Sequence, residues 1–262
     1  MTIFKKEMKQ GFMSLAIWTV ATAFMVVICV VLFPEMKGQM EDVTDLFANM
    51  GGFTAAFGMD RVSFGDMMGF YAVECGNILG IGGGFYAAFL GISILASEEK
   101  DRTAEFLLSH PVSRIRVLSE KLMAVIVQIL IFNLVVVISS ALSIRGIGES
   151  VDWEIFALLH LAFFVLQLEL GCICFGISAF LKRGGLGIGL GLAMVFYFVN
   201  IIYNISDDLS FMKYLTPYAY AEASSIVADA KLNLPLMGIG IAVGIIGAAV
   251  GYIQYSRKDI AA

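Results

Sequence analysis

Few ionisable side chains lie within the long apolar stretches of this sequence, and they limit the chemistry that the chain could perform. Glu169 is an acidic residue deep inside such a stretch, and His110 and His160 stand in different segments. The sequence contains no phosphate-binding G-x-x-x-x-G-K-[ST] motif, no H-E-x-x-H motif and no G-x-S-x-G motif. We therefore expect no ATP binding through a phosphate loop, no zinc chemistry, and no cofactor or metal on this chain.

Glu169 leaves several interpretations open. A charge at that depth is costly, so we expect the side chain to face protein or water, near Gln128, Asn133 or Asn200. It could be a polar point on a substrate path, a proton-linked carboxylate, or a structural contact between helices. Two rival functions would use it: a proton-coupled secondary transporter, or a membrane-embedded enzyme that acts on lipids. Because catalysis normally needs converging titratable groups, the enzyme is the weaker alternative.

Composition places the chain in a membrane. Of its 262 residues, 59% are hydrophobic and only 15% are charged, whereas soluble domains carry roughly 25% charged residues. A helix needs about twenty apolar residues to cross the hydrocarbon. The sequence predicts an all-α integral membrane protein with a single transmembrane domain over residues 1–262. Its six predicted spans are residues 12–33, 75–97, 122–144, 155–181, 185–205 and 234–255.

The basic residues predict the orientation of these spans. Most of the 17 Lys and Arg residues lie before the first span, between the second and third, between the fourth and fifth, and after the last. Cytoplasmic loops carry such an excess of Lys and Arg. We therefore expect both termini and residues 98–121 in the cytoplasm. The other loops are predicted to lie outside, where acidic residues predominate.

Three segments outside the spans have amphipathic helical patterns. At the amino terminus, apolar residues share one face and lysines the other, which suits a short helix on the cytoplasmic leaflet. Two outer segments repeat the pattern, so we expect two short helices lying on or dipping into the outer leaflet, with nearby tyrosines at headgroup level. The apolar positions are Phe4, Met8 and Phe12; Val43, Leu46, Phe47 and Met50; and Ala219, Ala223, Ile226, Val227 and Ala230.

Residues 98–121 form the only long charged segment between two spans. Ala104, Leu107 and Leu108 have helical spacing, and Pro111 should end that helix. Ser113 could then cap a second helix that runs into the third span. The pattern predicts a helix, a break and a helix on the cytoplasmic side. The alternative is a plain interfacial connector.

The sequence of residues 98–114, EEKDRTAEFLLSHPVSR, resembles the cytoplasmic loop of type-2 ATP-binding-cassette (ABC) exporter permeases. In that family, acidic residues, Gly-Thr, a further acidic residue, a leucine pair and Pro-Val-Ser-Arg follow the second span. Arg102 departs from the pattern, since the family has glycine at this position. By resemblance, the segment is a coupling helix that docks on an ATPase, through Glu98, Glu99, Arg102, Thr103, Glu105, Leu107, Leu108, Pro111 and Arg114.

The resemblance also implies partners and a location. The chain would be a permease subunit of an exporter, paired with a second permease copy or a paralogue, in a bacterial plasma membrane among its lipids. ATP and Mg²⁺ would bind to the partner ATPase. The substrate would be an amphipathic peptide, an antimicrobial compound or a lipid-like molecule. No nucleic-acid partner is expected.

Overall fold

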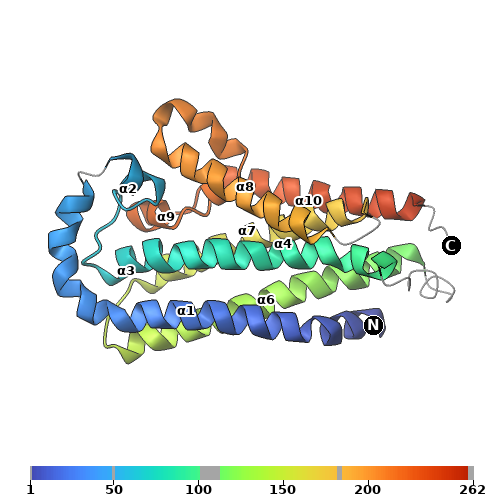
Figure 1. Cartoon of the computed structure of the whole chain (residues 1–262), viewed down its shortest axis with the longest axis horizontal. Coiled ribbons are helices and arrows are strands. Elements are labelled where there is room, and N and C mark those ends of the chain that lie inside the picture. The colour runs from blue at the N-terminus through green and yellow to red at the C-terminus, as the bar shows by residue number, and fades with distance from the viewer. Residues whose placement is uncertain (1, 49–50, 101–112, 182–184, 259–262) are drawn as a thin grey trace.

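The computed structural model describes residues 2–48, 51–100, 113–181 and 185–258, and every regular element within them is helical (Figure 1). Six helices are long and apolar enough to cross a membrane, which confirms the predicted fold class. Five of them are single elements, and the second span is composite. The long helices are α1 (Thr2–Ala48), α4 (Gly76–Lys100), α6 (Arg114–Gly146), α7 (Trp153–Ser178), α8 (Leu186–Ile205) and α10 (Leu234–Arg257).

The helices run lengthwise between two ends of the bundle. One end, which we name the terminal face, holds the start of α1, the end of α4, the start of α6 and the end of α10 (Figure 1). The opposite end, which we name the distal face, holds the short helices α2 (Gly52–Ala56), α3 (Met67–Phe70) and α9 (Ala223–Asp229). The charge pattern predicts that the terminal face is cytoplasmic.

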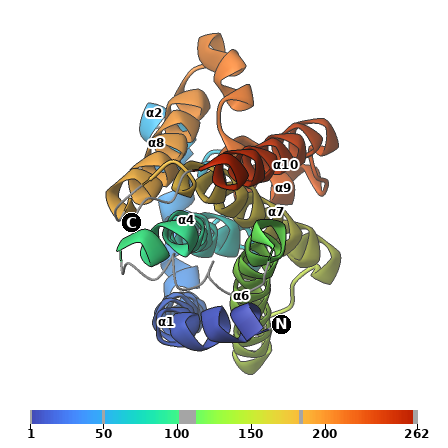
Figure 2. The same cartoon turned by 90° about the vertical axis from the view of Figure 1, so that its right-hand side faces the viewer.

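Helices α4 and α7 form the centre of the bundle. In their most apolar windows, 67% and 61% of the residues are buried, against 17% in α8 and 22% in α10. Helix α1 packs along α6 on one side, whereas α8 packs against α4 and α10 against α7 (Figure 2). The outer faces of α8 and α10 are therefore largely open.

Helix α1 is longer than the predicted first span, and it corrects one expectation. It begins at Thr2, so the amino-terminal amphipathic segment runs without a break into the span. It continues through Pro34 to Ala48, so Val43, Leu46 and Phe47 belong to α1 and not to the separate short helix that was expected, while Met50 lies outside the described residues. Proline removes one backbone hydrogen bond and kinks a helix without having to end it. Figure 1 shows the axis of α1 turning at the distal face.

The second span begins earlier than residue 75. Helix α3, the π-helix Tyr71–Cys75 and α4 follow one another directly, and the candidate span covers Met67–Ala96. The carboxylate of Asp66 caps its start by accepting from the backbone N–H groups of Met68 at 3.1 Å and Gly69 at 3.2 Å. Glu74, which the sequence placed in the outer loop, therefore lies within the helix.

Other helix ends follow recognisable signals. Ser113 caps α6 as predicted, because its hydroxyl accepts from the N–H of Arg116 at 3.3 Å. Asp152 caps α7 in the same way, through the N–H groups of Glu154 and Ile155. The fourth span ends at Ser178, slightly before its predicted limit.

The outer segment before α10, which was expected to lie on or dip into the outer leaflet, packs into the bundle in part. It forms two short 3-10 helices, Asp207–Tyr214 and Pro217–Ala219, and then α9. Tyr218, Tyr220 and Ile226 are buried, whereas Tyr214 is exposed. The expected helix therefore forms in part, but the segment packs into the bundle because its tyrosine hydroxyls find polar partners there.

Candidate functional site

A segment without α-helix, which includes the short 3-10 helix Pro217–Ala219, lies at the distal face. Residues 216–222, which we name the distal strap, connect to the long helices through alternate side chains. The hydroxyl of Thr216 donates to the carbonyl of Phe196 in α8 at 2.7 Å. The hydroxyl of Tyr218 donates to the carbonyl of Gly80 in α4 at 3.2 Å. Non-helical backbone near membrane depth is tolerated where it is buried in protein or lines a cavity.

Glu169 is the next anchor of the distal strap. Its Oε2 accepts a hydrogen bond from the hydroxyl of Tyr220 at 2.9 Å, and the residue is only 6% exposed. Burial raises the pKa of Tyr220 well above its usual range, so the hydroxyl keeps the proton that it donates. A Cβ at Gly240 would collide with the Glu169 carboxylate, so the backbone of α10 passes directly against it. Glu169 thus joins α7, α10 and the distal strap.

None of the polar residues expected near Glu169, all within the described part of the chain, forms a hydrogen bond with it; its partner is Tyr220. Asn133 donates instead to Oε1 of Gln167 at 2.7 Å, and Asn200 donates to Glu222. Residues two apart on a helix point in different directions, so Gln167 and Glu169 face different neighbours. Gln128 lies against α1, where a Cβ at Gly11 would meet its amide.

Glu222 is the last anchor, and sequence reasoning missed it. Its Oε2 accepts from the amide of Asn200 at 2.6 Å and from that of Asn204 at 2.9 Å, and the hydroxyl of Ser224 donates to Oε1 at 3.3 Å. Asn200 and Asn204 stand one turn apart on α8 and are buried. The sequence did contain a signal: two asparagines stand four residues apart in an apolar stretch. Amides placed inside a membrane bundle need polar partners.

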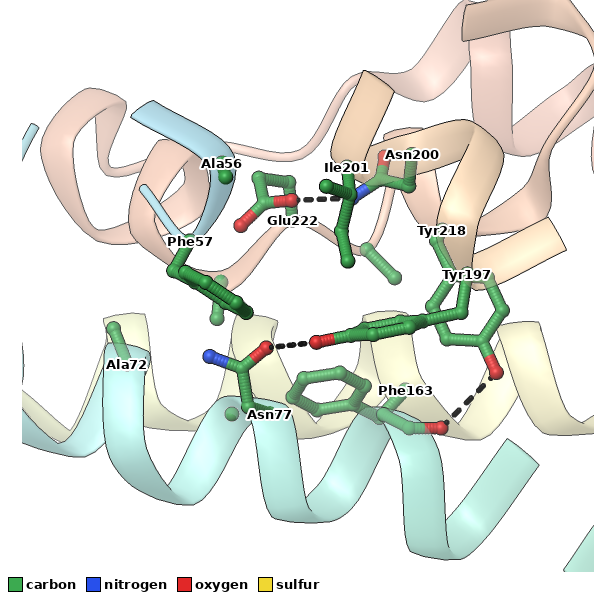
Figure 3. Close-up of a pocket in the computed structure, with 14 residues that line it drawn as sticks. Ala56, Phe57, Ala72, Asn77, Phe163, Tyr197, Asn200, Ile201, Tyr218 and Glu222 are labelled. Carbon is green, nitrogen blue, oxygen red and sulfur yellow. Dashed lines mark hydrogen bonds between the residues drawn. The ribbon is translucent and has the colours of Figure 1, made fainter. Parts of the chain in front are cut away.

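Two pockets meet at Glu222. The inner pocket encloses about 30 Å³ between α2, α4, α7 and α8 (Figure 3). Its wall includes Tyr197, whose hydroxyl donates to Oδ1 of Asn77 at 2.9 Å. The outer pocket encloses about 470 Å³ and is lined by both basic and acidic residues, including Arg61, Asp229 and Lys231. A third pocket of about 70 Å³ has Glu169 and Tyr220 in its wall.

A buried ion pair ties three helices together at the terminal face. Lys121 of α6 is fully buried, and its Nζ donates to Oε1 of Glu7 in α1 and to the carbonyl of Ile94 in α4, both at 2.8 Å. Glu7 is also buried, with a side-chain exposure of 8%. Buried charges need such partners, because an unpaired charge in a protein interior costs several kcal/mol. The ion pair therefore fixes the end of α4 relative to α1 and α6.

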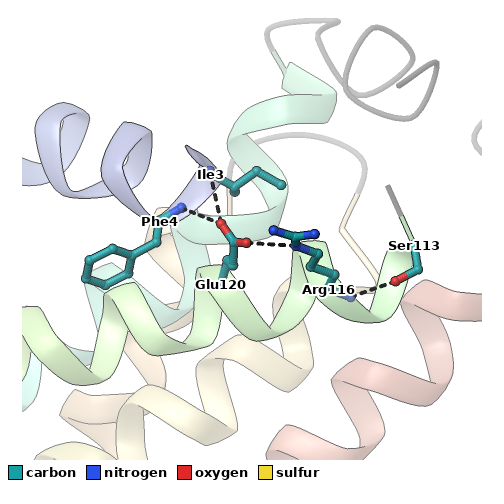
Figure 4. Close-up of polar contacts among 5 residues, drawn as sticks. All are labelled: Ile3, Phe4, Ser113, Arg116 and Glu120. Carbon is teal, nitrogen blue, oxygen red and sulfur yellow. Dashed lines mark hydrogen bonds and ion pairs between the residues drawn. The ribbon is translucent and has the colours of Figure 1, made fainter. Parts of the chain in front are cut away.

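The start of α1 is held by Glu120 of α6 (Figure 4). Its Oε2 accepts from the backbone N–H groups of Ile3 and Phe4, both at 3.1 Å, and its Oε1 accepts from Nε of Arg116 at 3.1 Å. The first N–H groups of a helix lack partners within the helix, so the carboxylate acts as a cap supplied by another helix. Lys5, on the predicted basic face of this segment, is exposed.

Arg114, predicted to dock on a partner, contacts the end of α10 in this structure. Its Nη1 donates to the carbonyls of Tyr255 at 3.2 Å, Ser256 at 3.2 Å and Lys258 at 2.7 Å. Guanidinium donors suit the unpaired carbonyls at a helix end. Of the other predicted docking residues, Glu98 and Glu99 lie in the last turns of α4. Outside the described residues lie Arg102, Thr103, Glu105, Leu107, Leu108 and Pro111.

Comparison with known proteins identifies one family. The family model described as ABC-2 family transporter protein matches residues 1–260, which is nearly the whole chain. A search of curated proteins finds no match.

Proposed function

The chain belongs to the ABC-2 transporter family, and on that premise we propose that it is the permease subunit of an exporter energised by ATP hydrolysis on a separate subunit. The family match over residues 1–260 carries the proposal. The absence of a phosphate-loop motif from the sequence supports the assignment of ATP and Mg²⁺ to a partner. The expected substrate is an amphipathic peptide, an antimicrobial compound or a lipid-like molecule.

The terminal face suggests how movement of the ATPase would reach the membrane. A subunit docked between Lys100 and Arg114 would pull on the end of α4 and the start of α6. Removing one partner of a buried ion pair costs about 3–5 kcal/mol, so the contact of Lys121 with Glu7 resists separation. Helix α1 would therefore move together with α4 and α6. Arg114 would carry the same movement to the end of α10.

The distal strap would close the opposite end of the path. Opening it requires the hydrogen bonds of Thr216, Tyr218, Tyr220 and Glu222 to separate. A typical intramolecular hydrogen bond contributes about 0.5–1.5 kcal/mol, so the set is worth a few kcal/mol. When two conformations differ in free energy by this amount, binding of a ligand or nucleotide can shift the protein from one to the other. Alternate closure and opening of the strap fits an exporter.

A second permease copy would complete the pathway. The open faces of α8 and α10 contain large apolar side chains, including Val195, Phe198 and Ile245. Gly187 and Gly191 of α8 have no neighbour within 4 Å of an added Cβ, so this face could accept a closely packed helix. Lipids would cover the parts of these two helix faces that the second copy does not contact.

The proposal is tested by isolating the native chain from its membrane under mild conditions. A soluble subunit with a phosphate-loop motif should copurify, and ATP hydrolysis should belong to that subunit and not to the isolated chain. Transport by the reconstituted chain without any ATPase would contradict the proposal and favour the proton-coupled carrier.

A further inference from the structure

The inner pocket contains a carboxylate and no basic residue. Its lining residues are all described by the structure, and among them Glu222 carries the only charge. Among these described lining residues, Oδ1 of Asn200 is buried without a hydrogen-bond partner. Buried acceptors without donors call for a bound group that supplies them. An acceptor-rich, negatively charged site favours a cation that can donate hydrogen bonds.

The carboxylate retains the capacity to accept. A carboxylate has about four lone-pair positions. Oε2 of Glu222 accepts two hydrogen bonds, and Oε1 accepts a single one from Ser224 at 3.3 Å. Figure 3 shows Glu222 above the space between Phe57 and Tyr197. Within the described part of the chain, no lysine, arginine or histidine forms an ion pair with it; Arg61, which lines the outer pocket, donates to Ser225 instead.

The walls of the inner pocket are aromatic. Figure 3 shows the rings of Phe57, Tyr197 and Phe163 around the space beneath Glu222. Tyr197 and Tyr218 meet edge to face, with ring centroids 5.5 Å apart. Aromatic faces attract ammonium groups, more strongly where water is excluded. A carboxylate surrounded by aromatic rings therefore discriminates in favour of an organic cation.

The size of the pocket restricts the cation further. A volume of about 30 Å³ holds roughly two water molecules, which suits a primary ammonium group and is tight for a trimethylammonium group. The larger outer pocket also touches Glu222 and has apolar side chains in its wall, among them Ile226, Leu232 and Leu236. The body of an amphiphile could lie there.

From these observations we propose that the inner pocket binds the primary ammonium group of an amphipathic cation, with Glu222 as its charge partner. The inference rests on the proposed function, since it names the substrate class of the permease. The ammonium group could belong to a free amphiphile or to a lipid headgroup.

Binding of radiolabelled dodecylammonium to the purified full chain, in nanodiscs of phosphatidylcholine, tests the proposal without any ATPase. Glu222→Gln keeps the shape and removes the charge, so affinity should fall at least about tenfold, as expected when a charge-assisted hydrogen bond is lost. Asp208→Asn, at an exposed carboxylate that lines none of the three pockets, is the matched control and should change affinity less than about twofold. Equal binding by Glu222→Gln and the wild type would overturn the proposal.

A second variant guards against misfolding of the first. A Cβ at Gly80 would meet Phe163 at 3.5 Å and Tyr218 at 3.6 Å, which are ordinary contacts, so Gly80→Ala narrows the pocket without strain. It should weaken dodecylammonium binding, whereas Gly187→Ala, in open space on α8, should not. Unchanged binding by Gly80→Ala would place the ligand elsewhere.

Two ligand comparisons complete the test. Dodecyltrimethylammonium has the same charge and a larger head, so it should bind more weakly; equal affinity would contradict the size argument. Replacing half of the lipid by phosphatidylethanolamine should leave binding intact if the ligand is a free amphiphile. Competition by that lipid in the wild type but not in Glu222→Gln would support a lipid headgroup as the source of the same ammonium group. Because no partner is needed, failure here leaves the ATPase test unaffected.

Discussion

Replacing Lys121 by methionine removes the ammonium group that contacts both Glu7 and the carbonyl of Ile94 at the terminal face. The side chain of Lys121 is fully buried, and that of Glu7 is only 8% exposed. Breaking such a pair from one side leaves a buried charge without compensation and costs about 3–5 kcal/mol. We expect Lys121→Met to lower the free energy of unfolding by this amount, towards the lower value because Glu7 retains some exposure.

The matched variants separate charge from packing. Lys9→Met, an exposed lysine on the same segment of α1, should change stability by less than about 0.5 kcal/mol. The double variant Glu7→Leu with Lys121→Met replaces the pair by apolar side chains and should recover most of the loss, because such replacements are often neutral. Unfolding by titration with sodium dodecyl sulfate, followed by circular dichroism, measures all three. Wild-type stability in Lys121→Met would refute the assigned role of the ion pair.

The remaining predictions concern orientation and the distal strap. In a background without the native cysteines, Lys182→Cys should resist an impermeant thiol reagent applied to intact cells, whereas Asp207→Cys should react; labelling at position 182 would reverse the topology. Glu169→Leu should reduce transport, because it leaves the buried hydroxyl of Tyr220 without its acceptor, at a cost of about 1–3 kcal/mol. Glu169→Gln, which can still accept, should be milder, and wild-type transport by both variants would make Glu169 incidental.

The sequence predicted the six membrane-spanning helices, because length and apolar composition alone decide whether a helix can cross a membrane. It was less informative about their ends. The first span was predicted to end at residue 33, yet the helix continues through Pro34 to Ala48 because a proline removes only one backbone hydrogen bond. The early start of the second span depends on Asp66, a cap that lies within a loop rich in other polar residues.

The site was predicted in part. Glu169 was found because a carboxylate stands out in an apolar stretch, but its partner Tyr220 lies 51 residues away, and local patterns do not report such pairings. Glu222 was counted among the acids of the outer loops, since its hydrogen bonds to α8 depend on the return of the distal strap to the bundle. Lys121 was counted with the basic loop, although α6 starts at Arg114 and places it inside the helix.

We propose above that a separate ATPase docks on the segment of residues 98–114, and capture of that subunit tests the proposal most directly. Leu107 and Leu108 are the expected apolar anchors, and truncating such an anchor commonly costs more than about 1 kcal/mol of binding. Tagged wild-type chain should retain the ATPase and stimulate its hydrolysis. The double variant Leu107→Ala with Leu108→Ala should insert and fold normally yet release the ATPase. Normal capture and normal stimulation in the double variant would contradict the account, because the segment would then be only a connector.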